Sequence, residues 1–228
     1  MTRPFRGHIL ESRGKDMDNF VITIARQYGS GGRTIGEELA KKLGISYYDK
    51  DIIRMASEES GIHEQLFGRA DENVSTKQRF FAKSGIYKGE LIPPQSKDFT
   101  SDENLFNYQA KVIRQLAEKE SCVIIGRCAD YILKDTEGIQ LVRAFIYAPN
   151  DVRVHNIMES HNLSEKDAKL LLDEKDKRYH KRHLALTGSN RGDRHNRDIL
   201  INSDFLGIQG TAEYLEDLIA KKYGKKEA

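Results

Sequence analysis

The side chains best suited to chemistry lie in a glycine-rich segment near the start of the chain, residues 29–34, with the sequence GSGGRT. Its glycines allow backbone N–H groups to approach a ligand closely, because no Cβ intervenes. Arg33 adds a planar cation that can hold two phosphate oxygens, and Thr34 adds a hydroxyl group. Together these groups indicate a phosphate site.

The segment departs from the usual phosphate-loop pattern, G-x-x-x-x-G-K-[ST], at two positions. Gln27 stands in place of the first glycine, and Arg33 stands in place of the lysine. The alternative interpretation is a glycine turn that only lets a strand and a helix pack closely.

The elements expected on either side favour the phosphate loop. Residues 21–25, VITIA, are apolar and rich in β-branched side chains, which is typical of a buried strand. From Thr34 onward apolar residues recur at helical spacing, and Gly44 ends the expected helix. A strand, a glycine turn and a helix direct free amides and the positive end of a helix dipole to one point.

Further arginines occur where they could surround a phosphoryl group. Arg26 ends the first strand, Arg127 follows a later strand, and Arg178 and Arg182 lie four residues apart on one face of a charged helix. Phosphoryl transfer requires such positive charge more than covalent chemistry from the protein. The alternative for the 175–182 run is a solvated helix with ion pairs, and arginines at 191, 194 and 197 are more often surface residues or ion-pair partners.

Two oxygen-bearing side chains have alternative interpretations. Thr34 lies where a hydroxyl would meet Mg²⁺ bridging two phosphates, although it could equally be a helix N-cap. Asp49 follows a short strand at 45–48 and could bind a ribose or a base amine, or hold a metal through water. The alternative for Asp49 is an N-cap for the helix expected over 50–60.

These residues must be positioned by an alternation of strands and helices. Strands are expected at 21–25, 45–48, 122–125, 141–148 and 198–202. Several are continuous apolar runs, which predicts a doubly wound parallel sheet covered by helices on both faces. In such α/β folds ligands bind beyond the carboxyl ends of the strands. Residues 62–101 lack a clean period and indicate a lid or a small helical insertion.

Composition excludes several functional classes. The net charge is only +2, which argues against a dedicated nucleic-acid binder, and no apolar run is long enough for a membrane span. The first residues are charged and do not form a secretory signal, so we expect a cytoplasmic protein with residues 1–17 as a flexible leader. Cys122 and Cys128 have neither disulfide-framework nor metal-site spacing, and His180 and His183 indicate a solvated helix face.

Several motifs together resemble those of the cytidylate kinase-like family of bacterial nucleoside monophosphate (NMP) kinases. They are the GSGGR loop with a helix ending in Leu-Gly, YYDK at 47–50, IIGR at 124–127, D-x-R at 176–178, and INS at 201–203 followed by Leu-Gly. The resemblance covers residues 20–222, nearly the whole chain.

What the resemblance implies is an α/β P-loop kinase fold with a five-stranded parallel sheet of order 2-3-1-4-5. It also implies that ATP and Mg²⁺ are used to phosphorylate CMP or dCMP. Residues 18–228 would then form a single domain with an NMP-binding insertion at 56–110 and a lid at 164–197. Small-molecule nucleotides would be the partners of a monomer or homodimer.

Site roles follow by position in the matching motifs. The residues that match the phosphate loop are Gly29, Gly31, Gly32, Arg33 and Thr34, with Thr34 also on the metal. From their place at the loop, Arg26 and Ser30 are expected to bind the phosphates of ATP as well. Asp49 and Arg127 would bind the acceptor, and Arg33, Arg178 and Arg182 would supply catalytic charge.

The chain also departs from the family pattern. Aligned without gaps, Gly32 falls where better-known members have the catalytic lysine, and a shift of one residue makes Arg33 its substitute. The D-x-G-x-x-x-R element becomes DKDIIR at 49–54, and Cys128 replaces an aspartate. Two alternatives therefore remain: a nucleotide-binding regulatory protein without turnover, and a P-loop kinase for another small acceptor.

Overall fold

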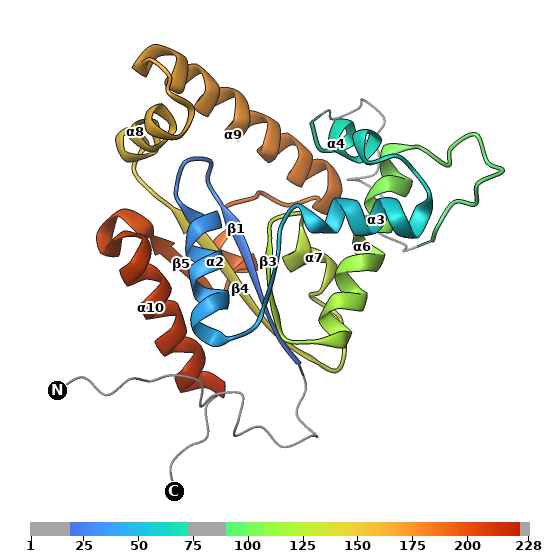
Figure 1. Ribbon diagram of the computed structural model, residues 1–228, viewed down its shortest axis with the longest axis horizontal. Coiled ribbons are helices and arrows are strands. Elements are labelled where there is room, and N and C mark those ends of the chain that lie inside the picture. Colours follow the sequence, from blue (N-terminus) through green and yellow to red (C-terminus); the bar gives the residue numbers. More distant parts are fainter. Residues whose placement is uncertain (1–18, 73–89, 224–228) are drawn as a thin grey trace, which may run out of the picture.

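The computed structural model describes residues 19–72 and 90–223, built around one five-stranded parallel sheet (Figure 1). Its strand order is β2-β3-β1-β4-β5, which confirms the predicted fold. The strands are β1 (Asn19–Arg26), β2 (Ser46–Tyr48), β3 (Cys122–Ile125), β4 (Ile139–Tyr147) and β5 (Ile199–Asn202). The expected leader at 1–17 and residues 73–89 of the expected insertion lie outside the described residues.

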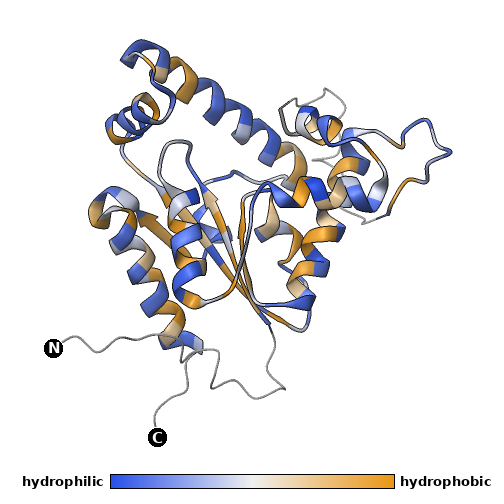
Figure 2. Cartoon of the chain, viewed as in Figure 1, coloured by the Kyte–Doolittle hydropathy of each residue, from blue (hydrophilic) through white to orange (hydrophobic). Residues whose placement is uncertain are grey.

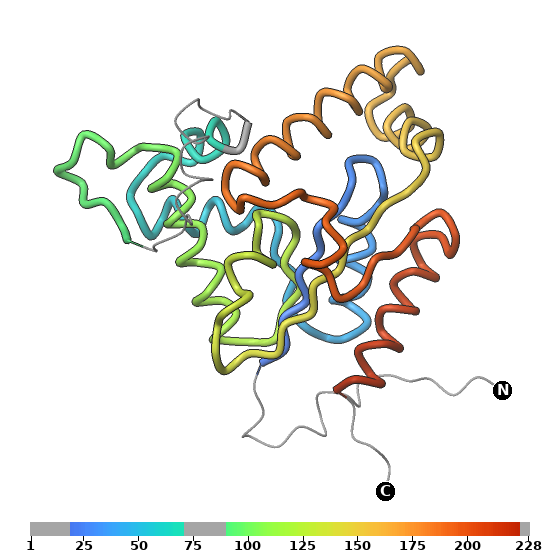
Figure 3. Tube along the Cα trace, turned by 180° about the vertical axis from the view of Figure 1, so that it is seen from behind, coloured from blue at the N-terminus to red at the C-terminus, as the bar shows by residue number. Residues whose placement is uncertain are grey.

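Helices cover both faces of the sheet. One face carries α2 (Gly32–Leu43) and α10 (Ser203–Tyr223). The other carries α3 (Asp51–Ser60), α4 (Glu64–Glu72), α6 (Asp102–Lys119) and α7 (Ala129–Ile132). Helices α8 (Asn150–His161) and α9 (Glu165–Thr187) form a pair beyond the carboxyl end of β1, as Figures 1 and 3 show. A 3₁₀ turn, η1 (Arg194–Asn196), precedes β5.

Two apolar cores explain the continuous apolar run of β1. Phe20, Ile22 and Ile24 pack with α2 and α10, whereas Val21 packs with α6 and its neighbours. Because alternate side chains of a strand point to opposite faces, a strand buried on both sides must be apolar throughout. Figure 2 shows the apolar residues on the strands and the inward sides of the helices.

Predicted boundaries differ from the structure at two helices. Helix α2 begins at Gly32 rather than Thr34, and the long charged helix α9, expected to run through His183, continues to Thr187. The sequence Ser164-x-x-Asp167 resembles a capping box and predicts the start of α9. The structure confirms this cap, since Ser164 Oγ accepts a hydrogen bond from the Asp167 amide at 3.2 Å and donates one to the Asp167 carboxylate at 2.6 Å. Within the described segments, no helix is long and apolar enough to cross a membrane.

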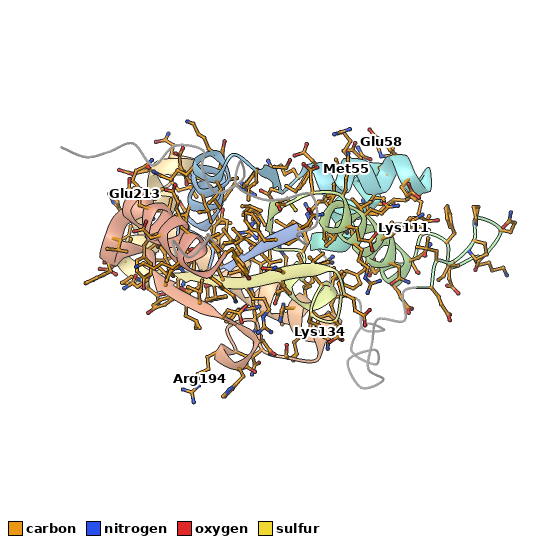
Figure 4. All side chains as sticks on the ribbon, turned by 90° about the horizontal axis from the view of Figure 1, so that it is seen from below. Met55, Glu58, Lys111, Lys134, Arg194 and Glu213 are labelled. Carbon is orange, nitrogen blue, oxygen red and sulfur yellow. The ribbon has the colours of Figure 1, made fainter. Side chains whose placement is uncertain are left out.

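Side chains also fix α3 against α6. Lys111 of α6 forms an ion pair with Glu59 of α3, and Figure 4 shows Met55, Glu58 and Lys111 together at this end. This ion pair links the exposed sides of the two helices.

Close packing of α2 on the sheet depends on Gly36. A Cβ there would lie 2.5 Å from Ile125 Cδ1 and 3.0 Å from Ile24 Cδ1. We expect Gly36→Ala to lower the free energy of unfolding by about 1–3 kcal/mol, measured by urea denaturation, because the core becomes overpacked. Gly68→Ala is the matched control: a Cβ at Gly68 meets nothing within 4 Å, so this helical substitution should stabilise by about 0.5–1 kcal/mol. Equal effects of the two substitutions would contradict the packing argument.

Candidate phosphate-binding and acceptor site

A cavity of about 770 Å³ opens beyond the carboxyl ends of β1, β2 and β3. Its walls come from α3 and α4 on one side and from α9 on the other. Six of the predicted site residues line it: Arg26, Arg33, Asp49, Arg127, Arg178 and Arg182. The glycines of the loop and Thr34 are not among the lining residues; they adjoin the cavity through Arg33.

The loop between β1 and α2 requires glycine at two positions. Gly29 and Gly31 have φ of 77° and 75°, a region that residues with side chains rarely adopt. A Cβ at Gly29 would also lie 2.7 Å from the Arg153 carbonyl oxygen. The buried Ser30 hydroxyl donates to the Gln27 carbonyl at 2.9 Å, and the Ser30 amide donates to the same carbonyl at 3.4 Å.

Amides of the loop are free to bind an anion. Within residues 19–72 and 90–223, no acceptor receives a hydrogen bond from the amides of Gly29, Gly31, Gly32, Arg33 or Thr34. Unpaired amides and the helix dipole together make such a helix start attractive to phosphate. The start of α2 therefore fits phosphate groups.

The carbonyl groups of the loop are held by the protein instead. Arg153 Nε donates to the Tyr28 carbonyl at 2.8 Å, and Asn156 Nδ2 donates to that of Gly29 at 2.8 Å. Ser203 Oγ donates to the Ser30 carbonyl at 2.7 Å. These bonds fix the side of the loop that faces away from a ligand.

Sequence reasoning missed Arg153, and it named Asp176 only as part of the D-x-R motif without its role as the partner of Arg153. Arg153 is 2% exposed and forms an ion pair with the Asp176 carboxylate, which also accepts the Tyr28 amide at 3.4 Å. A signal was present, because Arg153 stands in the buried stripe of α8 with Val154 and Ile157. Its partner on α9 could not be identified from sequence.

Arg33 and Asp49 are in direct contact. Arg33 Nε lies 2.5 Å from Asp49 Oδ2, where the Arg33 side chain is half exposed and that of Asp49 is nearly buried. The capping alternative for Asp49 is wrong, since Lys50 is the N-cap of α3 and no side chain caps it. The capping alternative for Thr34 is also wrong, because Gly31 is the N-cap of α2 and Thr34 is the third helical residue.

A left-handed turn positions Arg127. Gly126, Arg127 and Cys128 have φ of 68°, 54° and 55°, and two of these residues carry side chains. Such strain persists only where surrounding contacts enforce it. Arg127 Nε donates to the Asp49 carbonyl at 2.8 Å, and Nη1 donates to Gln109 Oε1 at 3.1 Å. Arg127 thus joins the ends of β2 and β3 to α6.

Helix α9 brings two of the predicted arginines to the cavity. Arg178 pairs with Glu174 at 3.6 Å, and Arg182 donates to the carbonyl of Ala70 at the end of α4. The predicted lid and the predicted insertion are therefore in contact through Arg182.

The three arginines after α9 have different surroundings. Arg191 lines the cavity and donates to the Arg26 carbonyl. Arg197 is buried in an ion pair with Asp130. Arg194 is exposed and projects away from the fold in Figure 4. The alternative of a surface residue or ion-pair partner is therefore confirmed for Arg194 and Arg197, whereas Arg191 faces the cavity.

Positive charge dominates the cavity. Eight lining residues are lysine or arginine and three are aspartate or glutamate, although the whole chain carries only +2. Burial lowers the pKa of Arg26, and burial beside Arg26 lowers that of Arg191 to about 10. A cavity of this charge fits a polyanionic ligand.

His183, near the C-terminal end of α9, is in contact with Cys128. The expected solvated position of His183 is wrong, because it is buried with Nδ1 3.6 Å from Cys128 Sγ. Burial lowers the pKa of His183 to about 4 and raises that of the Cys128 thiol to about 12. In the described part of the chain, no group of acidic, His and Cys side chains could hold a metal by itself.

The buried His183 makes stability depend on pH. Its pKa falls from 6.5 to about 4 on folding, so the unfolded chain binds a proton that the folded protein does not. Stability should decrease as pH falls from 6.5 to 4, by about 3 kcal/mol from this group. We expect His183→Gln to flatten this slope in urea unfolding measured across that range, and the control His195→Gln, on the exposed η1 turn, to retain it. Parallel curves for His183→Gln and the original protein would contradict the assignment.

Comparison with known proteins agrees with this geometry. A sequence model of the cytidylate kinase-like family matches residues 21–205. The chain belongs to this family. It is 26% identical over 186 residues to a cytidylate kinase of Thermoplasma volcanium, covering 81% of this chain and 83% of that protein. It is 24% identical over 211 residues to a cytidylate kinase of Thermococcus sibiricus, covering 91% and 92%.

A solved structure has a similar fold. The crystal structure of an uncharacterized protein from Eubacterium ventriosum matches with a TM-score of 0.60 and 25% identity, covering 91% of this chain and all of that chain. Membership of the family, with its P-loop kinase fold, implies the use of ATP.

Proposed function

We propose that the protein transfers the γ-phosphoryl group of ATP to a nucleoside monophosphate, with CMP or dCMP as the preferred acceptor. The observation that carries this proposal is the cationic cavity that adjoins the unpaired amides of the loop. A donor phosphate at the loop and an acceptor phosphate in the cavity would both be surrounded by arginine. The cytidylate kinase names of the relatives support the choice of acceptor.

The donor half of this site uses the loop. The unpaired amides within residues 29–34 and the Arg33 guanidinium bind the phosphates of ATP, and Thr34 is the residue that would hold Mg²⁺. When bound, the metal neutralises charge on the phosphates. Arg33 reaches the phosphates by leaving Asp49, from which its half-exposed side chain can rotate.

The acceptor half uses Arg127 and the wall formed by α3 and α4. Arg127 holds an acceptor phosphate oxygen, and Asp49 binds the ribose or the base amine. We assign the NMP-binding insertion to residues 56–110 and the lid to residues 164–197, whose arginines Arg178 and Arg182 face the same cavity.

The reaction requires no general base from the protein. An oxygen of the acceptor phosphate, already ionised, forms a bond to the γ-phosphorus of ATP as the bond from that phosphorus to the bridging oxygen breaks. The products are ADP and a nucleoside diphosphate. Arg33, Arg178 and Arg182 stabilise the charge that the transferred group carries between the two oxygens.

An acceptor panel tests the proposal. We expect ADP formation from Mg·ATP, followed in a coupled assay, with CMP or dCMP, and slower or no formation with UMP, AMP and GMP. ATP binding without turnover on any monophosphate would contradict it and favour the nucleotide-binding regulatory protein.

Substitutions at the Arg33–Asp49 contact separate monophosphate from hydroxyl acceptors. Arg33→Ala should lower kcat by about 100-fold or more, because a charge that stabilises the transferred group is lost. Asp49→Asn should mainly raise the KM for the acceptor while kcat changes by less than about 10-fold, since no proton is abstracted. A collapse of kcat in Asp49→Asn would instead indicate a catalytic base and a hydroxyl acceptor.

A further inference from the structure

Arg26 lies between two glycines at the edge of the cavity. It is the last residue of β1, and its stem passes beneath the start of α2. A Cβ at Gly32 would lie 2.7 Å from Arg26 Cβ and 3.1 Å from Arg26 Cγ. A Cβ at Gly126 would overlap Arg26 Nη1. The two glycines thus form a cradle for this side chain, here called the Arg26 cradle.

The cradle gives a physical reason for glycine at position 32. Gly32 is the first residue of α2 and does not have a positive φ, so its backbone conformation is open to any residue. Glycine in a helix is otherwise destabilising. The close approach of Arg26 excludes a side chain at Gly32, which is the position where an ungapped alignment places the lysine of better-known family members.

The guanidinium of Arg26 has no counterion of its own. Throughout residues 19–72 and 90–223, no acceptor forms a hydrogen bond or a close ion pair with it, while its backbone carbonyl accepts a bond from Arg191. The Asp49 carboxylate attracts the Arg26 guanidinium from a distance, but its direct contact is with Arg33. Arg26 is partly exposed and has no bonded acceptor among these residues, so its charge is available to an anionic ligand.

The surroundings of Arg26 favour phosphate as that ligand. Arg33 and Arg127 are close enough to lower its pKa further, so three guanidinium groups face one space at the edge of the loop. Their mutual repulsion is relieved when a polyanion enters.

We propose that Arg26 is the fixed cation that binds the phosphates of ATP in place of the missing loop lysine. This inference rests on the proposed function for the identity of the ligand. Arg26 and Arg33 contribute in different ways, because the cradle holds Arg26 before the nucleotide arrives, whereas Arg33 moves to the nucleotide from Asp49. The competing explanation is that Arg26 only fills space beneath Gly32.

Binding measured without an acceptor separates these explanations. Arg26→Met keeps most of the stem and removes the charge. By titration calorimetry we expect it to weaken ATP binding about 10-fold to 100-fold, because a charged contact to phosphate is lost. Adenosine, which lacks phosphate, should bind both proteins equally, and Arg26→Lys should lose less affinity for ATP than Arg26→Met.

A matched control uses another partly buried arginine of the sheet. Arg143 of β4 pairs with Asp198 at 2.8 Å and does not line the cavity, so Arg143→Met should leave ATP affinity unchanged. Unchanged ATP affinity in Arg26→Met would overturn the proposal. If Arg26→Met does not fold, Gly32→Ala supplies the test, since its Cβ displaces the Arg26 stem without removing charge; it should weaken ATP binding but not adenosine binding.

Turnover distinguishes failure of this inference from failure of the proposed function. If the original protein phosphorylates CMP, Arg26→Met should lower kcat about 100-fold or more. Full turnover in that variant would overturn the role of Arg26 and leave the kinase proposal standing. If the original protein turns over no monophosphate, selective loss of ATP affinity in Arg26→Met would support the phosphate role of Arg26 while the kinase proposal fails.

Discussion

Mutual repulsion among arginines is the constraint on which the rest of this site depends. The carboxyl edge of the sheet gathers eight cationic residues around one cavity, and each must be kept in place without a ligand. The fold uses internal acceptors for several of them: Arg33 pairs with Asp49, Arg178 with Glu174, and Arg191 with Asp176. Backbone carbonyls accept hydrogen bonds from other arginines, among them Arg127 and Arg182.

This arrangement makes the phosphate loop part of a larger network. Its carbonyls are fixed by α8 and by Ser203, while one of its amides is tied to Asp176 of α9. A helix pair distant in sequence therefore determines the shape of a loop that sequence motifs describe as local. Displacement of α9 would change the loop even if every glycine stayed in place.

Most of the fold could be predicted from the sequence because it depends on local patterns. The apolar runs predicted all five strands, and Ser164 and Gly44 marked helix ends that the structure confirms. The sequence also predicted those site residues that lie at the ends of strands: Arg26 ends β1, and Asp49 and Arg127 follow β2 and β3. The strand order came from the resemblance to a family, since apolar patterns alone do not specify neighbours.

What escaped prediction depends on contacts between distant segments. The burial of Arg153 and His183 is decided by which helix faces them, and neither residue type is usually buried. The contact of Arg33 with Asp49 joins helix α2 to the end of β2 in three dimensions. In the sequence Gly32 cannot be told from the other glycines of the loop, because its close contact with Arg26 exists only in the folded structure.

The carboxylates at the site have a consequence for affinity. Asp49 and Asp176 pair with Arg33 and Arg191, two of the arginines that line the cavity an incoming phosphate would enter. Ligand binding at these points is therefore an exchange of one anion for another, and its free energy is a difference between two paired states. Such an exchange weakens the binding of the product as well as of the substrate, which favours rapid release over tight retention.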